Sequence, residues 1–471
     1  MTPDSHSKRL SERRVPFRYS FCGGLLLLLV VGGLALSGPR AGAAASESSE
    51  VFVDHWLQDH KEDVVQLYEQ LHAQPELSMQ EEKTARTAAE ALGRVGFAVT
   101  EGVGETGVVA VLHNGEGPTL LIRADMDGLP VREETGLPYA SEVTVAGPSG
   151  DRVGVMHACG HDIHMTALLS TARIMASAQS LWSGTLVLIA QPGEEVGKGA
   201  RAMLEDGLFR RFPRPDSTVA LHVESGLPAG MLGFSSGWAM ANVDSVDITF
   251  FGRGGHGARP HQSIDPIVAA SSFVLSVQTL VSRRIAPQDP AVVTVGSFHA
   301  GTKHNVIPDE AHLQLTVRSY SDEVRRQLLD GIAQLARDTS RTFGAPKGPQ
   351  IDVRDEYTPA VYNDPALTQR AVGVFRGVFG AGNVVERKPS MGGEDFGRYG
   401  RALGIPSLLY RVGAQEPGRY RASLEPGGEP LPSLHSSRFA PAAGPTLDAA
   451  IRSLSLLALD VLALTGSGQD R

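Results

Sequence analysis

Apolar positions along the first half of the chain follow two different periods. Apolar residues spaced three and four positions apart predict helices over 51–71, 81–95 and 165–178. Short apolar runs between turn residues predict strands over 108–113, 119–123, 186–190 and 219–223. Strands that alternate with helices are typical of an α/β fold, in which helices cover both faces of a sheet.

The pattern changes near residue 237 and changes back after residue 348. In between, it predicts strand, helix, strand, strand and helix over 246–251, 266–281, 292–298, 311–319 and 322–342. This order is that of a small two-layer α+β sandwich of the ferredoxin-like type. The α/β pattern then resumes and closes with a helix over 446–464. We therefore predict a main domain with a mixed sheet covered by helices, formed by 50–240 and 349–467 and interrupted by an inserted satellite domain at 241–348.

The amino terminus has the three regions of an export signal. Five basic residues precede the apolar run 21–36, and small residues follow at 41–45. We predict a signal peptide over 1–45 and a secreted or periplasmic mature protein with no stable membrane association; the alternative is an uncleaved membrane anchor. Cys22 would leave with the signal, so the mature chain keeps only Cys159 and cannot form an internal disulfide.

Composition and charge narrow the class of protein further. Apolar residues make up 42% of the chain and charged residues 20%, as in globular proteins. The formal net charge is −9, and no long basic run follows the first twenty residues. Because an acidic surface repels a phosphate backbone, we exclude a nucleic-acid partner.

Candidate metal ligands concentrate between His157 and His164, in the sequence HACGHDIH. Three imidazoles, one thiol and one carboxylate within eight positions favour a metal-binding cluster. The alternative, a buried cysteine beside surface histidines, explains each residue but not the whole cluster. An unpaired thiol in an exported protein is open to oxidation unless a metal ion holds its thiolate. We therefore expect this segment to bind metal.

Glu194 and Glu195 follow the predicted strand 186–190, and ligands of an open α/β sheet bind outside the carboxyl ends of its strands. Adjacent carboxylates on a loop point in different directions. One can then bind a metal ion while its neighbour acts as a base toward water. Such a pair on its own is usually a solvated turn.

Four further polar residues lie in or after predicted strands or before the last helix: His222, His435, Asp125 and Asp127. Either histidine alone is more often a surface residue than a ligand. Metal-bound imidazoles usually donate their other nitrogen to a carboxylate, so the two aspartates suit a supporting position behind the ligands.

Five motifs together resemble one known family. They are RADMDGLP at 123–130, MHACGHDIHMT at 156–166, QPGEE at 191–195, GGHGARPH at 254–261 and MGGEDF at 391–396. In this order they resemble the amidohydrolase branch of the dinuclear metallopeptidases, which includes aminoacylase, carboxypeptidase G, hippurate hydrolase and plant auxin-conjugate hydrolases. The resemblance covers essentially the whole chain after the signal, and it implies that the main domain is catalytic and the satellite a dimerisation domain.

The resemblance also implies roles for matching residues. Two divalent ions, manganese or zinc with cobalt as a further option, would be held by Cys159, His161, Glu195, His222 and His435, with Cys159 as the bridge. Glu194 would be the general base. His256 resembles a histidine that reaches across a dimer into the partner's active site. Asn305 and Arg318 resemble the pair that binds the substrate's carboxylate and carbonyl, and a guanidinium matches a carboxylate bidentately.

The activity implied is hydrolysis of the amide bond of N-acyl or N-aroyl amino acids, or of short peptides, by a homodimer. Three alternatives remain. An exported metallo-aminopeptidase or dipeptidase would differ in what occupies the amine side. A cysteine hydrolase would use Cys159 as nucleophile with His161 or His222 as base. A non-catalytic binding protein would use the metal for stability alone.

Overall fold

The computed structural model describes residues 41–147, 150–355 and 357–464. The predicted export signal lies almost entirely outside these residues. From Ala45 onward the chain forms one compact unit. The predicted domain boundaries at 240/241 and 348/349 therefore stay predictions.

An eight-stranded mixed sheet forms the larger part of the fold, in the order β1-β2-β6-β3-β7-β18-β8-β17. In that order the strands are Ala98–Val103, Gly107–Asn114, Gly184–Gln191, Thr119–Asp125, Ser217–Pro228, Ser407–Gln415, Leu232–Phe234 and Val384–Glu386. The four central strands β6, β3, β7 and β18 run parallel to one another, so their carboxyl ends share one edge. This confirms the predicted mixed sheet and brings together segments that are far apart in the sequence.

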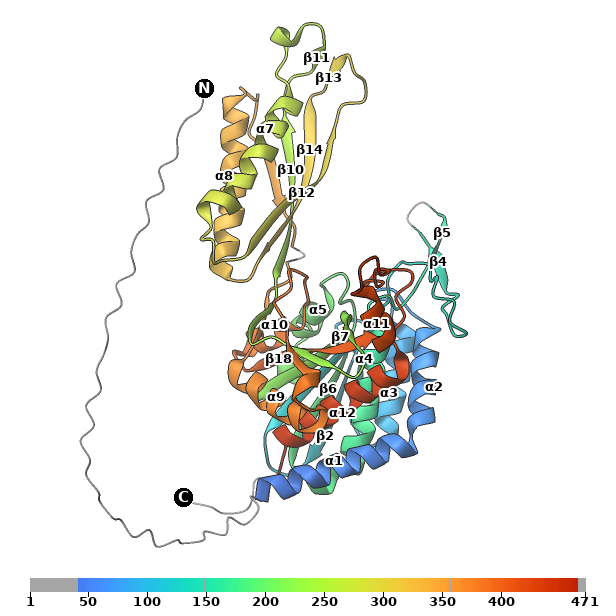
Figure 1. Ribbon diagram of the computed structural model, residues 1–471. Helices are drawn as coiled ribbons and strands as arrows, with labels where there is room; N and C mark the ends of the chain where they lie inside the picture. The colour runs from blue at the N-terminus through green and yellow to red at the C-terminus, as the bar shows by residue number, and fades with distance from the viewer. Residues whose placement is uncertain (1–40, 148–149, 356, 465–471) are drawn as a thin grey trace, which may run out of the picture. The chain divides into compact units, whose positions relative to one another are not determined.

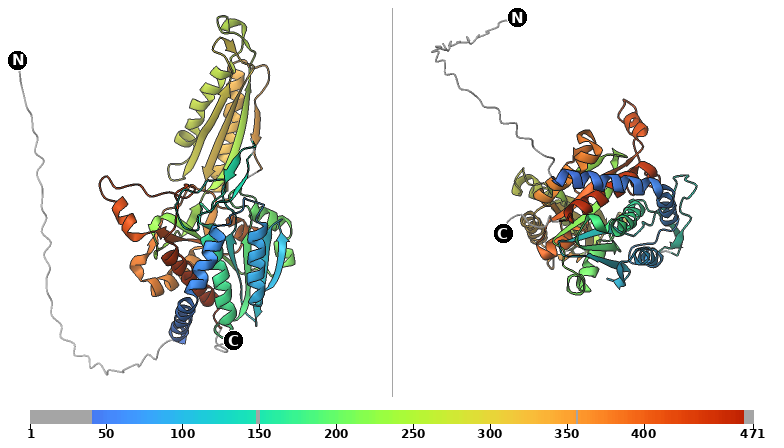
Figure 2. Two further views of the ribbon diagram at one scale, coloured as in Figure 1. Left: turned by 90° about the vertical axis from the view of Figure 1, so that its right-hand side faces the viewer. Right: turned by 90° about the horizontal axis from the view of Figure 1, so that it is seen from below.

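Helices cover both faces of this sheet (Figures 1 and 2). Alternate residues of a strand face opposite sides, and β18 shows this clearly. Tyr410 packs into one core and Leu409 into the other. The first core is built with α1 (Ala41–Asp59), α2 (Lys61–His72), α3 (Glu82–Arg94), α4 (His161–Ser177), α9 (Pro365–Phe379) and α12 (Ala443–Val461). The second is built with α5 (Gly199–Glu205), α6 (Leu208–Arg211) and α10 (Gly397–Leu403).

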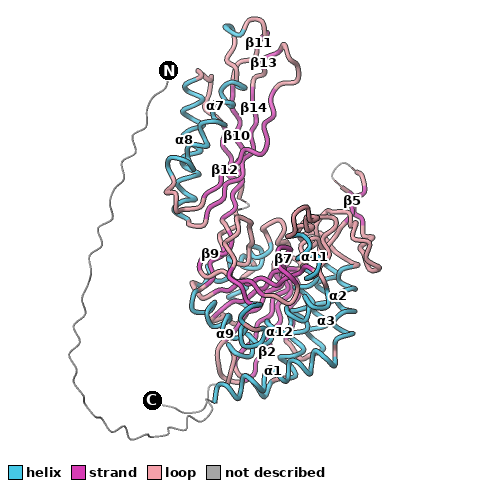
Figure 3. The backbone as a smooth tube through the Cα atoms, viewed as in Figure 1, coloured by secondary structure: helices cyan, strands magenta, loops and turns pink. Residues whose placement is uncertain are grey.

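A separate four-stranded antiparallel sheet has the order β12-β14-β10-β15 and carries two helices (Figure 3). Its elements are β10 (Asn242–Phe251), α7 (Pro266–Thr279), β12 (Ala291–Ala300), β14 (Glu310–Ser319), α8 (Asp322–Thr342) and β15 (Gln350–Val353). The order β-α-β-β-α-β agrees with the ferredoxin-like pattern expected from the sequence. Phe250, Phe273 and Leu328 belong to a hydrophobic core that this sheet forms with its two helices. This core is distinct from the two cores of the larger sheet.

The stretch Pro266–Arg284 is long and apolar enough to cross a membrane by length and composition. It consists of α7 and a π-helical turn over Leu280–Arg284. Phe273 and Val277 bury its inner face against the four-stranded sheet. A core helix of this kind passes the same test as a spanning helix, so the finding alone does not indicate insertion.

Three predicted helices differ from those observed by three residues or more. The closing helix predicted over 446–464 is α12, which begins and ends three residues earlier. The helix predicted over 51–71 is interrupted at His60, between α1 and α2. The helix predicted to start at 165 starts at His161, because Gly160 adopts a left-handed conformation with φ of 81° immediately before it. A Cβ at Gly160 would lie 2.5 Å from a methyl of Val223, so glycine is needed there. Cys159 and His161 are thereby held on either side of the turn that opens α4.

Candidate metal centre

A cavity of about 1280 Å³ opens at the carboxyl edge of the central strands. Its walls come from the end of β7, the loop after β6, the turn before α4, and the loop before α12. Among the residues that line it are Cys159, Glu194, Glu195, His222 and His435. Residues from four distant parts of the sequence therefore meet at one place.

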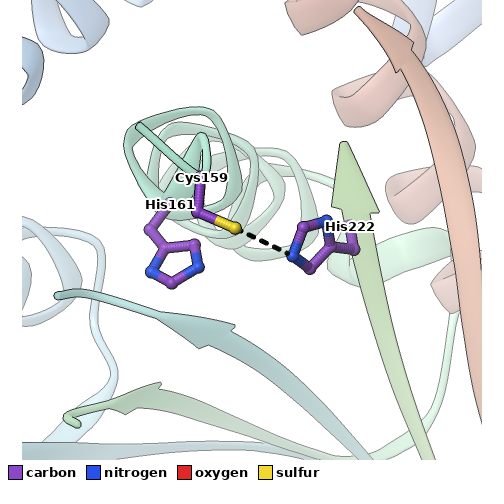
Figure 4. Close-up of side chains that lie close together, drawn as sticks. All are labelled: Cys159, His161 and His222. Atoms are coloured by element: carbon purple, nitrogen blue, oxygen red, sulfur yellow. Dashed lines mark hydrogen bonds between the residues drawn. The ribbon is translucent and has the colours of Figure 1, made fainter. Parts of the chain in front are cut away.

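The first group of potential ligands is Cys159, His161 and His222 (Figure 4). Their ligand atoms all lie within 4.8 Å of one another, and Cys159 Sγ is 3.5 Å from His222 Nε2. His222 Nδ1 donates to the carbonyl of Val223 at 2.7 Å, and His161 Nδ1 donates to the carbonyl of Asp127 at 2.9 Å. A carbonyl only accepts, so each Nδ1 carries a proton and each neutral ring presents a free electron pair on Nε2.

The second group shares its sulfur with the first. Cys159, Glu195 and His435 place their ligand atoms within 4.8 Å of one another, and His435 Nε2 lies 3.4 Å from Glu195 Oε2. His435 adopts a left-handed φ of 67°, and its backbone N–H donates to the carbonyl of Ala158 at 2.9 Å. That bond holds the strained residue beside the segment that carries Cys159. A thiolate common to both groups is the geometry that a bridging ligand requires.

Unpaired buried atoms provide an independent test of whether these residues fit metal ions. Among the described residues, His161 Nε2 and Glu195 Oε1 are buried without a hydrogen-bond partner. Buried polar atoms are nearly always satisfied, so two such atoms facing one space indicate a missing partner. Thiolate, imidazole and carboxylate are the donors that zinc and other transition ions prefer. The residues present therefore fit two divalent cations.

Burial sets the charge of the ligands in the metal-free protein. It raises the pKa of the Cys159 thiol well above its usual range, and it raises the pKa of Glu195 to about 7. Burial alone would lower the pKa of His161, but the neighbouring Asp125 carboxylate outweighs it and raises that pKa. A bound cation reverses all three tendencies, because it stabilises thiolate, carboxylate and neutral imidazole.

Glu194, the residue predicted to be the base, lies beside this centre. Its Oε2 is 4.0 Å from His161 Nε2, and its side chain lines the cavity. Burial, and then the negative charge of Glu394, raise the pKa of Glu194 well above its usual range. A carboxylate in such surroundings is a stronger base than one in water.

The two predicted supporting aspartates occupy different positions. Besides its carbonyl contact, Asp127 has a carboxylate oxygen 3.2 Å from His161 Nδ1. Asp125 instead accepts from Arg123 Nη1 at 2.7 Å and from His164 Nδ1 at 2.6 Å. Of these, Asp127 is the one that orients a candidate ligand.

Several supporting residues were missed by reasoning from the sequence. Arg123 is buried and forms ion pairs with Asp125, Glu394 and Asp395. His164 accepts from the backbone N–H of Val223 through Nε2 at 2.9 Å. The motifs at 123–130 and 391–396 were the available signal, but nothing in their spacing indicated that they pair with each other.

The three remaining predicted site residues do not all reach this cavity. Arg318 on β14 is half-buried, lines the cavity, and donates from Nε to Thr316 at 2.9 Å. His256 and Asn305 are exposed and lie beside each other, at the short ladder β11 (Gly255–His256) and β13 (Val306–Ile307). Neither lines the cavity of its own chain.

A second buried cluster, also missed, lies behind the start of α4. His72 Nδ1 is 2.6 Å from Asp162 Oδ2, and its Nε2 is 3.1 Å from Glu133 Oε1. Burial alone would lower the pKa of His72, but hydrogen bonds to the two carboxylates outweigh it and raise that pKa to about 10. His72 is therefore a buried cation that ties α2 to the residue next to His161.

Comparisons with known proteins agree with this arrangement. Residues 121–424 match the family described as Peptidase family M20/M25/M40. A hippurate hydrolase from Campylobacter jejuni subsp. jejuni is 38% identical over 336 residues, which are 70% of this chain and 82% of that protein. Thermostable carboxypeptidase 1 from Saccharolobus solfataricus is 35% identical over 340 residues, 71% of this chain and 82% of that protein. The crystal structure of a dinuclear metal binding peptidase from Bacillus subtilis matches with a TM-score of 0.69 at 29% identity, covering 86% of this chain and 99% of that one.

Proposed function

Because the chain belongs to peptidase family M20/M25/M40, we propose that it is a metal-dependent amidohydrolase that cleaves N-acyl or N-aroyl amino acids into a carboxylic acid and a free amino acid. The observation that carries this proposal is that four candidate ligands and one additional carboxylate, Glu194, line a single cavity, with the fifth ligand, His161, grouped with Cys159 and His222. A structural metal site is closed and needs no spare base, whereas a hydrolytic site needs both a base and space for substrate. The name of the relative from Campylobacter, hippurate hydrolase, supports the same chemistry.

In the proposed reaction, different residues hold the metal ions, transfer the proton and bind the substrate. Two divalent ions, manganese or zinc, would be held by Cys159, His161, Glu195, His222 and His435; when bound, such ions polarise a carbonyl and acidify water. Glu194 takes the proton from the attacking water and later passes it to the leaving amine. Arg318 binds the substrate's carboxylate through its guanidinium.

We further propose that the active form is a homodimer. His256 and Asn305 are exposed side by side, away from the cavity of their own chain. In a dimer they would enter the partner's cavity, where His256 would stabilise the oxyanion and Asn305 would bind the substrate carbonyl. Mixing a Glu194→Gln chain with a His256→Ala chain tests this directly, because only the mixed dimer would contain one complete site. Mixtures no more active than the separate variants would contradict it.

The basic, apolar and small-residue regions over 1–45 support export of the protein and removal of this segment. The mature chain would then act outside the cytoplasm with no stable attachment to the membrane. Amino-terminal sequencing of the exported protein would test this proposal, and an intact residue 1 would contradict it.

The decisive experiment for the reaction is Glu194→Gln in metal-reconstituted protein. Glutamine keeps the shape of the side chain but cannot take a proton, so kcat should fall by a factor of about 10² to 10⁴. Metal content should stay unchanged because Glu194 is not a ligand. Glu134→Gln is the matched control, since Glu134 is an exposed carboxylate on a neighbouring loop. Turnover by Glu194→Gln near the parent rate would refute the base assignment.

Two other functions are distinguishable by simple assays. The relative named carboxypeptidase favours a peptidase as the second candidate, and comparing a free dipeptide with its N-acylated form would decide. Cys159 and His222 also lie at the distance of a cysteine–histidine pair. Burial, however, raises the pKa of that thiol and lowers the pKa of that imidazole, which opposes a thiolate–imidazolium pair. A cysteine hydrolase would be insensitive to chelators, and chelator-sensitive turnover would exclude it.

A further inference from the structure

Arg411 is a second cation that faces the candidate active site. It lies on β18, directly opposite His222 of the neighbouring strand β7, and it lines the same cavity as Cys159 and Glu194. The side chain is half-buried. Its position in the sheet places it within reach of whatever molecule occupies the centre.

Arg411 has no acidic partner among the residues that the structure describes. Its one side-chain hydrogen bond runs from Nη2 to the thioether of Met240, at 2.8 Å. A thioether is a weak acceptor, and a guanidinium offers five N–H donors. The nearby Arg387, which lines the same cavity, is by contrast paired with Glu224. A half-buried, unpaired guanidinium is costly unless a ligand supplies the missing anion.

Arg318 and Arg411 approach one wall of the cavity from two sides. Arg411 contacts Met240, whose terminal methyl lies 3.1 Å from a Cβ built on Gly392. A Cβ built on Gly393 would lie 3.8 Å from Arg318 Nη1. The adjacent Gly392 and Gly393 therefore link the surroundings of the two guanidinium groups along this wall. Two anionic groups of the same half of a substrate could therefore be bound together.

We propose that Arg411 determines specificity by binding a second carboxylate on the amino-acid half of the substrate, so that N-acyl derivatives of dicarboxylic amino acids such as glutamate are preferred. This inference rests on the proposed amidohydrolase function. Arg318 binds the α-carboxylate and Arg411 the side-chain carboxylate. The cavity, of about 1280 Å³, has room for such a substrate with its acyl group.

The test compares N-acetyl-L-glutamate with N-acetyl-L-glutamine, which has nearly the same shape but no second charge, and repeats the comparison with the N-benzoyl pair. We expect metal-loaded parent protein to favour the glutamate substrate by about tenfold or more in kcat/KM, because a charge-assisted bidentate contact is lost with glutamine. In Arg411→Met this ratio should fall to about one. Arg411→Lys keeps the charge without the planar fork, so its ratio should lie in between.

Lys388→Met is the matched control. Lys388 is an exposed cation that lines the same cavity, so its removal changes the net charge equally. It should keep the parent's preference for glutamate. If Lys388→Met lowers the ratio as much as Arg411→Met does, general attraction by positive charge explains the preference and the assignment of Arg411 is overturned.

Failure of this inference differs from failure of the proposed function. Turnover of N-acyl amino acids without a preference for glutamate, or a preference unchanged in Arg411→Met, would overturn the role of Arg411 alone. Absence of turnover on any N-acyl amino acid would overturn the proposed function. In that case, the affinities of N-acetyl-L-glutamate and N-acetyl-L-glutamine for metal-loaded Glu194→Gln protein can still be compared by calorimetry. Equal affinities would refute the role of Arg411. Metal content and circular dichroism establish that each variant is folded.

Discussion

The substitution His72→Gln should destabilise the protein by an amount that depends on pH. His72 is completely buried between Asp162 and Glu133. Their hydrogen bonds outweigh the effect of burial and raise the pKa of His72 from 6.5 to about 10. A difference of this size corresponds to at most about 5 kcal/mol of folding free energy. In other proteins, removing one partner of a buried ion pair costs about 3–5 kcal/mol. The free energy obtained from the pKa of His72 agrees with this range.

The sign of the pH dependence follows from proton binding. Folded His72 holds its proton up to a higher pH than the unfolded chain does, so its contribution is complete below pH 6.5. As pH rises toward 10, only the folded state still binds that proton. The contribution then falls by about 1.4 kcal/mol per pH unit. The gap in stability between parent and His72→Gln should therefore be large at pH 6 and small at pH 9.5.

Urea unfolding of metal-free protein between pH 6 and 9.5 measures this gap. Trp56 and Trp182 are buried in the same core as α2 and α4, so their fluorescence follows the relevant part of the fold. His113→Gln is the matched control, because His113 is exposed on β2 and should change stability by less than about 0.5 kcal/mol. A gap that is the same at both ends of the pH range would refute the account of His72 as a buried cation.

Three further predictions concern the metal centre and one helix end. Cys159→Ser should reduce the metal content measured by atomic absorption from two ions to one or none, because the shared sulfur belongs to both ligand groups. Zinc binding at pH 7 should release protons, since burial raises the pKa of the Cys159 thiol and keeps the thiol protonated without metal. Calorimetry in buffers of different ionisation enthalpy would count the released protons. A count of zero would contradict this prediction. Asp364→Ala should cost about 1 kcal/mol in urea unfolding, because the Asp364 side chain accepts from Leu367 N–H and caps α9.

Elements with a strong local signal could be predicted from the sequence. The helix over 322–342 was predicted with its observed bounds because it is amphipathic and begins after Ser321, whose side chain accepts from Val324 N–H. Three of the four central strands, β3, β6 and β7, were located by their apolar runs, whereas β18 was not predicted. Three-residue strands such as β8 and β17 carry no period that a pattern could reveal.

Most candidate ligands could be predicted from the sequence, whereas the buried residues that support them could not. Cys159, His161 and Glu195 belong to compact motifs whose residue types have few other uses, whereas His222 and His435 were assigned only through the family resemblance. His72 and Asp162, by contrast, are 90 positions apart, and Arg123 pairs with Glu394 across 271 positions. Such pairs depend on tertiary packing, which no local pattern encodes. Arg411 lies in a strand whose sequence gives no sign that its guanidinium faces a cavity.

The charged residues in and around the cavity form an acidic set and a basic set. On the ligand side, burial raises the pKa of Glu194, Glu195 and Asp395, the last two to about 7, so the metal-free protein cannot keep all these carboxylates ionised without cost. Divalent cations remove that cost and restore ionised ligands. Two guanidinium groups that line the same cavity, Arg318 and Arg411, have no acidic partner among the described residues, and the proposed binding of substrate carboxylates would supply their counter-charges. The same electrostatic rule therefore explains why the acidic groups suit metal ions and why the two guanidinium groups suit carboxylates of the proposed substrate.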